Sequence, residues 1–189
     1  PPTANGQAPV TKPAIAAPAP VAAPTAVSVQ SAGDLAGEVA SLVEVAMGDP
    51  EGATEDGAYC NNRPISVSPV TKLSEGLLAT GFPYYRFEKL DAYLDIIKTF
   101  LDQTHCIGRL GSAAADLAYV ACGRLDGFWE FGLHLWDIAA GILLVKEAGG
   151  MVCDPFGGED YLKTGNVAAA NPLILRQFLK TIKPALQNF

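Results

Sequence analysis

Two acidic residues, Glu130 and Asp137, stand seven positions apart in a stretch that is otherwise almost entirely apolar. Glu130 lies in the apolar run 128–131, where burying an unpaired carboxylate would be costly. Asp137 precedes the apolar run 138–145, at the position of a helix N-cap. Its carboxylate can accept the free N–H groups of the helix start, worth about 1 kcal/mol, or bind a hard cation such as magnesium. Spacing alone favours the cap, and Glu130 shifts the balance toward a ligand.

A second turn from strand to helix occurs at Gly111-Ser112, directly before Ala113. Free backbone N–H groups at such a helix start attract anions, although an ordinary serine N-cap explains Ser112 equally well. Asp116 would lie inside the helix that follows, and Asp126 in the turn before the apolar run. Both of these acids are interpreted as structural.

The histidines and cysteines do not form a metal or redox motif. Neither His105 nor His134 has a cysteine or an acid at a metal-ligand spacing, and we expect His134 to pack in the turn between Glu130 and Trp136. The four cysteines are widely spaced and never form Cys-x-x-Cys, so they are expected to be buried, reduced thiols. They are Cys60, Cys106, Cys122 and Cys153.

These residues need a scaffold of alternating strands and helices, which the pattern from residue 57 onward predicts. Expected strands lie near 65–67, 76–80, 106–109, 127–131, 150–153 and 167–169. Expected helices lie near 87–101, 112–122, 136–148 and 172–183, the last beginning with the cap Asn171-Pro172. This order predicts a layered α/β sandwich, with helices on both faces of a mixed sheet. The strand at 128–131 and the helix after Asp137, including Leu143, should form its buried centre.

The N-terminal part differs in composition. Residues 1 to about 30 hold seven of the fourteen prolines, and we interpret 1–33 as a flexible Pro/Ala-rich arm and 34–189 as an α/β domain. Apolar residues at 39, 42, 43 and 46 favour an amphipathic helix over 34–47, although the valine content leaves a strand possible.

Charge and hydropathy exclude several classes of partner. A net charge of −7 argues against a nucleic acid or an anionic membrane, because both require a basic face. No apolar run of about 18 residues predicts a membrane span, and no signal peptide is evident. With 49% apolar residues the chain can bury a core. We therefore expect a cytoplasmic protein.

Three segments carry a resemblance to the inositol monophosphatase family. The stretch 136–141, Trp-Asp-Ile-Ala-Ala-Gly, followed by Glu-Ala-Gly-Gly at 147–150, resembles the second signature of that family. Residues 111–127 are similar to its Gly-Ser/Thr-Ala-Ala segment, and 73–84 resemble a segment further upstream. The resemblance covers about 57–186 and implies the C-terminal half of the family's layered fold. It also implies a magnesium-dependent phosphomonoesterase that acts on a small-molecule phosphate ester, such as inositol phosphate or a related sugar phosphate. The resemblance further implies a homodimer.

The same resemblance assigns roles to individual residues. Asp137 would bind the second magnesium ion and Glu130 would accept hydrogen bonds from substrate hydroxyls. Gly111, Ser112 and Ala113 would contact the ring hydroxyls of the substrate. A metal pair would activate a water for in-line attack on phosphorus.

The chain also departs from the family pattern. The motif Asp-Pro-Ile/Leu-Asp-Gly-Thr, which holds most metal ligands, is absent; residues 49–54 come near it, with Gly52 where the second aspartate would be. The pair of basic residues usual before Leu-Gly-Ser is Gly108-Arg109 here. A lone Asp137 would leave magnesium with nearly all of its waters. The alternative is therefore a non-catalytic fragment or pseudo-enzyme that acts as a binding or dimerisation module.

Overall fold

The computed structural model describes residues 57–61, 63–82 and 89–188. The predicted arm 1–33, the predicted helix 34–47 and the near-match at 49–54 lie outside these residues. The described part begins with a short antiparallel pair, β1 (Tyr59–Cys60) and β2 (Arg63–Pro64). A strand predicted at 65–67 is wrong, because its N–H groups bond to two separate places, Ile65 to the Ala58 carbonyl and Val67 to the Ala148 carbonyl.

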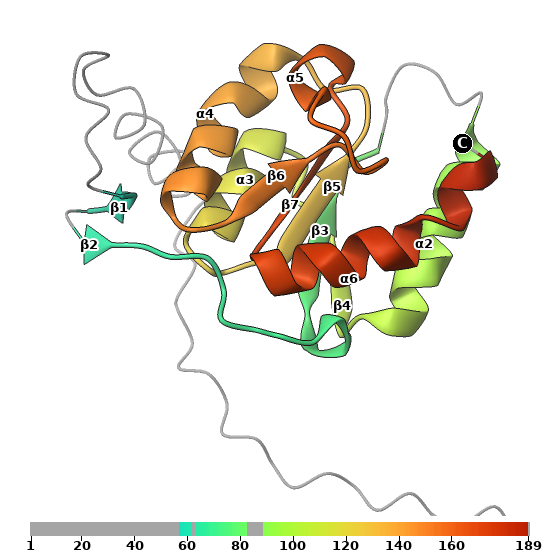
Figure 1. The fold of residues 1–189 in the computed structure, drawn as a ribbon, viewed down its shortest axis with the longest axis horizontal. Helices are drawn as coiled ribbons and strands as arrows, with labels where there is room; N and C mark the ends of the chain where they lie inside the picture. Colours follow the sequence, from blue (N-terminus) through green and yellow to red (C-terminus); the bar gives the residue numbers. More distant parts are fainter. Residues whose placement is uncertain (1–56, 62, 83–88, 189) are drawn as a thin grey trace, which may run out of the picture. The chain divides into compact units, whose positions relative to one another are not determined.

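A five-stranded mixed sheet forms the centre, in the order β4-β3-β5-β7-β6 (Figure 1). Its strands are β3 (Leu77–Thr80), β4 (Cys106–Gly108), β5 (Gly127–Glu130), β6 (Met151–Cys153) and β7 (Val167–Ala170). Strand β3 runs parallel to β4 and β5, whereas β7 is antiparallel to β5 and β6. The carboxyl ends of β3, β4 and β5 therefore lie at one edge of the sheet.

Helices cover both faces of this sheet, which confirms the predicted layered α/β fold (Figure 1). On one face lie α3 (Ala113–Ala121) and α4 (Leu135–Glu147), and on the other lie α2 (Leu90–Gln103) and α6 (Pro172–Ile182). The one-turn helix α5 (Tyr161–Thr164) and the 3₁₀ turns η1 (Leu73–Glu75) and η2 (Ala185–Asn188) were not predicted, because they are too short to show a period.

Strand β5 is buried on both faces, as predicted. Phe128 points into the layer of α3 and α4, and Trp129 points into the layer of α2 and α6. The Trp129 ring lies 4.9 Å from the Phe100 ring and 5.7 Å from the Phe178 ring. Burial of each such side chain stabilises the fold by about 1.5–3 kcal/mol.

Helix α4 is buried along one stripe only. Leu144 is 2% exposed, but Leu143 is 44% exposed, so the predicted burial of Leu143 is wrong. Consecutive residues of a helix point about 100° apart, so an unbroken apolar run cannot be buried throughout. The buried stripe of α4 packs closely against α3. A Cβ added to Gly141 would lie only 2.5 Å from the Leu117 Cβ, so this contact leaves no room for a side chain.

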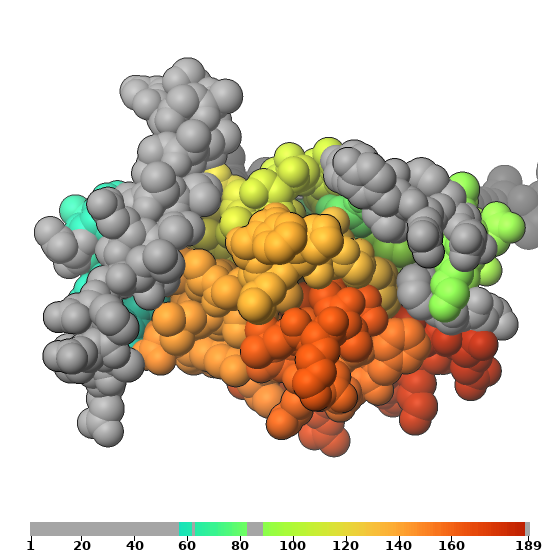
Figure 2. Space-filling view, turned by 90° about the horizontal axis from the view of Figure 1, so that it is seen from above, coloured from blue at the N-terminus to red at the C-terminus, as the bar shows by residue number. Residues whose placement is uncertain are grey.

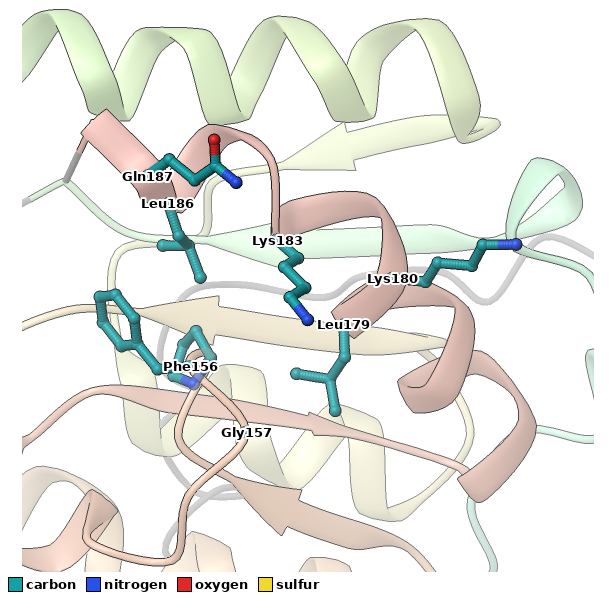
Figure 3. A pocket seen from close by; sticks show the side chains of 8 residues that line it. Phe156, Gly157, Leu179, Lys180, Lys183, Leu186 and Gln187 are labelled. Atoms are coloured by element: carbon teal, nitrogen blue, oxygen red, sulfur yellow. The ribbon is translucent and has the colours of Figure 1, made fainter.

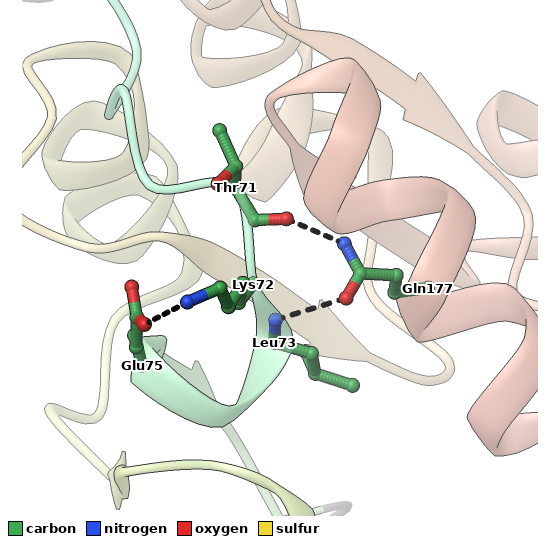
Figure 4. A network of polar contacts seen from close by, with 5 residues as sticks. All are labelled: Thr71, Lys72, Leu73, Glu75 and Gln177. Atoms are coloured by element: carbon green, nitrogen blue, oxygen red, sulfur yellow. Dashed lines mark hydrogen bonds and ion pairs between the residues drawn. The ribbon is translucent and has the colours of Figure 1, made fainter.

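Two polar side chains attach α6 to the segment before β3. Asn171 caps α6 as predicted, accepting hydrogen bonds from the N–H groups of Leu173 and Ile174. The Gln177 side chain donates to the Thr71 carbonyl over 2.7 Å and accepts from the Leu73 N–H over 3.1 Å (Figure 4). The nearby ion pair of Lys72 and Glu75 is exposed, so it adds little stability.

All four cysteines are free thiols, as expected, but the predicted burial is wrong, because three are half-buried and one is exposed. Cys106 is exposed, because β4 is an edge strand of the sheet. Burial and the neighbouring Asp154 raise the pKa of Cys153 to about 11. In the ranges that the structure describes, no helix has the length and apolar character that crossing a bilayer requires.

Candidate active site

The residues singled out in the sequence gather where β3, β4 and β5 end. Parallel strands and the helix starts that follow them commonly form a ligand-binding crevice at this edge. Helix α3 begins after β4, and helix α4 begins after β5. Figure 2 looks at the molecule from above Figure 1 and shows these two regions, yellow-green and gold, next to each other on the surface.

Glu130 is the last residue of β5 and is 8% exposed. Its carboxylate lies over Gly81, the residue after β3, since a Cβ added there would be 2.2 Å from three of its atoms. The pKa of Glu130 is raised to about 7, chiefly by burial and also by Asp116 and Asp137, while Arg109 acts in the opposite direction. One residue that follows β4 and two helical acids thus act on the carboxylate at the end of β5.

Asp116 is a second buried acid in this place. It lies in α3 with 1% of its surface exposed, and neither carboxylate oxygen has a hydrogen-bond partner in the described part of the chain. Burial raises its pKa from 3.8 to about 7, with Arg109 acting in the opposite direction. Asp116 lies inside α3 as expected, but no hydrogen bond from the described residues fixes its carboxylate, and it raises the pKa of Glu130.

Asp126 differs from Asp116 although both are buried. Its carboxylate accepts hydrogen bonds from the Ser68 hydroxyl and, over 2.6 Å, from the Leu77 N–H. These bonds attach the start of β5 to the start of β3. This arrangement agrees with the structural interpretation of Asp126.

Asp137 is the third residue of α4 rather than its N-cap, which is His134. The predicted cap position is wrong by three residues, because α4 begins at Leu135, with Leu135 and Trp136 exposed on its first turn. Asp137 still serves the helix start, since its Oδ2 accepts from the His134 N–H over 3.2 Å. His134 lies in the turn between Glu130 and Trp136, as expected, where its exposed ring stacks on the Trp136 ring at 4.4 Å.

Ser112 is the N-cap of α3, and its hydroxyl accepts from the Ala115 N–H over 3.4 Å. Gly111 and Ser112 are exposed at the edge of the sheet, whereas Ala113 is buried with 9% exposure. Gly111 has a φ of +97°, which favours glycine. The cap interpretation of Ser112 therefore holds, and the exposed backbone of this turn remains open to a ligand.

In the sequence Arg109 stands out only as a departure from the family pattern, but in the structure its charge acts on the buried acids of the site. An added Cβ on Gly111 would lie 2.8 Å from the Arg109 Nη1. The guanidinium carbon lies 5.9 Å from the centre of the Phe82 ring. Arg109 is thus the positive charge that acts on both buried acids. No local sequence signal pairs it with residues from other strands.

The described residues hold only part of a possible metal centre. Among residues 57–61, 63–82 and 89–188, no group of three or more His, Cys, Asp or Glu side chains is arranged to hold a metal ion. The carboxylate of Asp137 fits as one ligand of magnesium, which favours oxygen donors. The other ligands of such an ion are not found in the described part.

A separate hollow of about 570 Å³ lies elsewhere on the surface (Figure 3). It includes Phe156 and Gly157 from the loop after β6, and Leu179 and Lys183 from the region of α6. None of the acids discussed above lines it. The hollow is therefore lined by other residues than those at the strand ends.

The fold and the site define a class of protein: layered α/β domains that have acidic residues and helix starts at the carboxyl ends of parallel strands. A sequence profile described as "Inositol monophosphatase family" matches residues 35–187. The chain belongs to the inositol monophosphatase family.

Relatives in this family have two kinds of name. The chain is 47% identical to Nus factor SuhB of Pseudomonas aeruginosa over 132 residues, 69% of this chain and 49% of that protein. It is 45% identical to Inositol-1-monophosphatase of Mesorhizobium japonicum over 130 residues, again 69% and 49%. The chain spans about half the length of the curated relatives it matches, their C-terminal portion.

Solved structures resemble the same part of the chain. The suhB protein of Bartonella henselae is 42% identical with a TM-score of 0.64, covering 67% of this chain and 48% of that one. Inositol monophosphatase from Anabaena is also 42% identical with a TM-score of 0.64, covering 68% and 51%.

Proposed function

We propose that this chain carries the substrate-binding side of a magnesium-dependent phosphomonoesterase that hydrolyses inositol phosphate or a related sugar phosphate. One observation carries the proposal: Glu130, Asp137 and the turn 111–113 lie where three neighbouring parallel strands end. Metal-independent acid chemistry is less suited to this place, because Glu130 has no hydrogen-bonded base beside it among the described side chains.

Each residue has a part in this proposal. The Glu130 carboxylate accepts hydrogen bonds from the hydroxyls of the sugar ring. Gly111, Ser112 and Ala113 meet the ring through the backbone at the positive end of α3. Asp137 supplies one magnesium ligand. Magnesium, when bound, would activate a water and stabilise charge on the leaving oxygen.

The catalytic set is incomplete in the described residues, so the remaining metal ligands must come from outside them. We expect the 189-residue chain by itself to hydrolyse phosphomonoesters extremely slowly. The homodimer, the cytoplasmic location and the division into an arm 1–33 and a domain 34–189 belong to the same proposal.

The second candidate is a non-catalytic binding or dimerisation module. The missing motif favours it, and relatives named Nus factor SuhB are as similar to the chain as one named Inositol-1-monophosphatase. Sequence identity therefore does not choose between these functions. The expectation that the chain binds no nucleic acid rests on its net charge of −7.

Phosphate release from inositol 1-phosphate with excess magnesium tests the proposal. We expect slow release that requires magnesium and is abolished by Asp137→Asn, but not by the control Asp102→Asn at the exposed end of α2. A turnover within tenfold of a typical median of about 10 per second would refute the incomplete metal set. Bound inositol 1-phosphate without any release would favour the second candidate.

A further inference from the structure

Gly81 stands at the place that the Glu130 carboxylate fills. Thr80, the last residue of β3, pairs with Trp129 on β5, so Gly81 and Glu130 are the next neighbours along the two strands. A Cβ on residue 81 would lie 2.2 Å from Cδ, Oε1 and Oε2 of Glu130. Real Cβ atoms essentially never approach other heavy atoms closer than 3.0 Å. Alanine at 81 and the observed position of Glu130 therefore exclude each other.

The backbone conformation does not explain the glycine at this position. Gly111, Gly132 and Gly165 have positive φ angles that favour glycine, but Gly81 is not among the residues with positive φ. Alanine could adopt the backbone conformation of residue 81 without strain. The Glu130 carboxylate is thus the obstacle to a side chain there.

The backbone of Gly81 is held in place and cannot move aside easily. The Tyr93 hydroxyl, from α2, donates a hydrogen bond to the Gly81 carbonyl. The adjacent Thr80 hydroxyl donates to the Trp129 carbonyl over 2.7 Å, which joins the ends of β3 and β5. Tyr93 is 1% exposed and Thr80 is 2% exposed. A side chain at 81 would therefore displace the carboxylate rather than the strand.

We propose that Gly81 is a positioning residue: the space left by its missing side chain holds the Glu130 carboxylate at the edge of the sheet to which the proposed function assigns the substrate. This inference rests on the proposed function, because it gives the seated carboxylate the task of accepting substrate hydroxyls. It adds a residue that touches no substrate and acts through Glu130.

A double-mutant cycle in the 189-residue chain tests whether the Glu130 carboxylate fills the space at Gly81. Gly81→Ala should lower Tm by an amount on the order of 5 °C, because it overfills an occupied space. In the Glu130→Ala background the same change should lower Tm no further, because the space is then empty. The matched control is Gly108→Ala on β4, where an added Cβ would come no closer than 3.8 Å to another residue, so Tm should hold. Additive losses in the cycle would overturn the proposal.

Binding of myo-inositol 1-phosphate, followed by NMR titration, tests the consequence for the site. Gly81→Ala and Glu130→Ala should each weaken affinity by about tenfold or more, as expected for losing a hydrogen bond to a charged group. The double variant should bind no more weakly than Glu130→Ala, and Gly108→Ala should bind normally. If the two substitutions are non-additive in Tm but neither single variant changes the affinity, then Gly81 does make room for the Glu130 carboxylate, and the proposed substrate role of Glu130 is wrong. Weaker binding in Glu130→Ala alone would overturn the positioning role of Gly81.

Discussion

Replacing Asp116 by Asn should remove about 2–3 kcal/mol of the pH dependence of stability between pH 5 and 8. Asp116 is 1% exposed and its carboxylate oxygens have no hydrogen-bond partner in the described residues. The folded chain holds this proton more tightly than the unfolded chain, because the pKa rises from 3.8 to about 7. Asparagine keeps the size of the side chain and carries no charge.

The sign and size follow from linkage between protonation and folding. Below about pH 4 the carboxyl is protonated in both states and costs nothing. As pH rises toward 7 the unfolded chain ionises first, so the folded state loses stability, and above about 7 the loss is complete. The rise of the pKa from 3.8 to about 7 corresponds to a total stability loss of roughly 4 kcal/mol. About 2–3 kcal/mol of this loss falls between pH 5 and 8.

Urea unfolding of the wild type and Asp116→Asn at pH 5 and pH 8 measures this loss. The control is Asp95→Asn, because Asp95 is exposed and pairs with Lys98 at 3.1 Å on the surface. Glu130 contributes a slope of its own, so the difference between the variants is the relevant quantity. If Asp116→Asn keeps the wild-type pH dependence to within about 0.5 kcal/mol, the buried-acid interpretation of Asp116 is refuted.

Three further changes have expected outcomes. Asp137→Asn should leave the thermal stability of the metal-free chain nearly unchanged, because asparagine can still accept a hydrogen bond from the His134 N–H. Magnesium binding measured by calorimetry should fall. A stability loss above about 1 kcal/mol with unchanged magnesium binding would show that Asp137 only caps the helix. Leu144→Ala should cost about 2–5 kcal/mol in denaturant unfolding and Leu143→Ala less than about 1, and equal losses would contradict the stripe on α4. Asp126→Ala should cost about 1–3 kcal/mol in the same assay, because Leu77 loses its buried acceptor, and no loss would remove its structural role.

Much of the fold could be predicted from the sequence. Strands β3 and β5 and helices α3 and α6 appear within a few residues of their expected positions, since apolar runs, glycines and the Asn171-Pro172 cap mark their limits. Helix α4 also lies within one residue of the predicted 136–148, but its cap was misplaced at Asp137 because Leu135 and Trp136 are apolar yet exposed. Leu143 was misjudged for a similar reason: an unbroken apolar run does not reveal which side of the helix faces the sheet.

The contacts within the site were less predictable. Gly111, Ser112, Glu130 and Asp137 could be chosen from local patterns, because each stands at a turn or at the end of an apolar run. Asp116 reads as an ordinary helical residue, and the role of Gly81 depends on a strand 49 residues further along the chain. Such pairings come from the topology of the sheet, and no local spacing records them.

Residue-resolved NMR of the 189-residue chain with myo-inositol 1-phosphate tests the central claim most directly. If the substrate binds where β3, β4 and β5 end, the backbone amides of Gly111, Ser112 and Glu130 should shift as the ligand is added. The amides of Phe156 and Lys183, which line the separate hollow, should stay unchanged. Shifts confined to that hollow, or no shifts at the strand ends at saturating ligand, would contradict the assignment of the site.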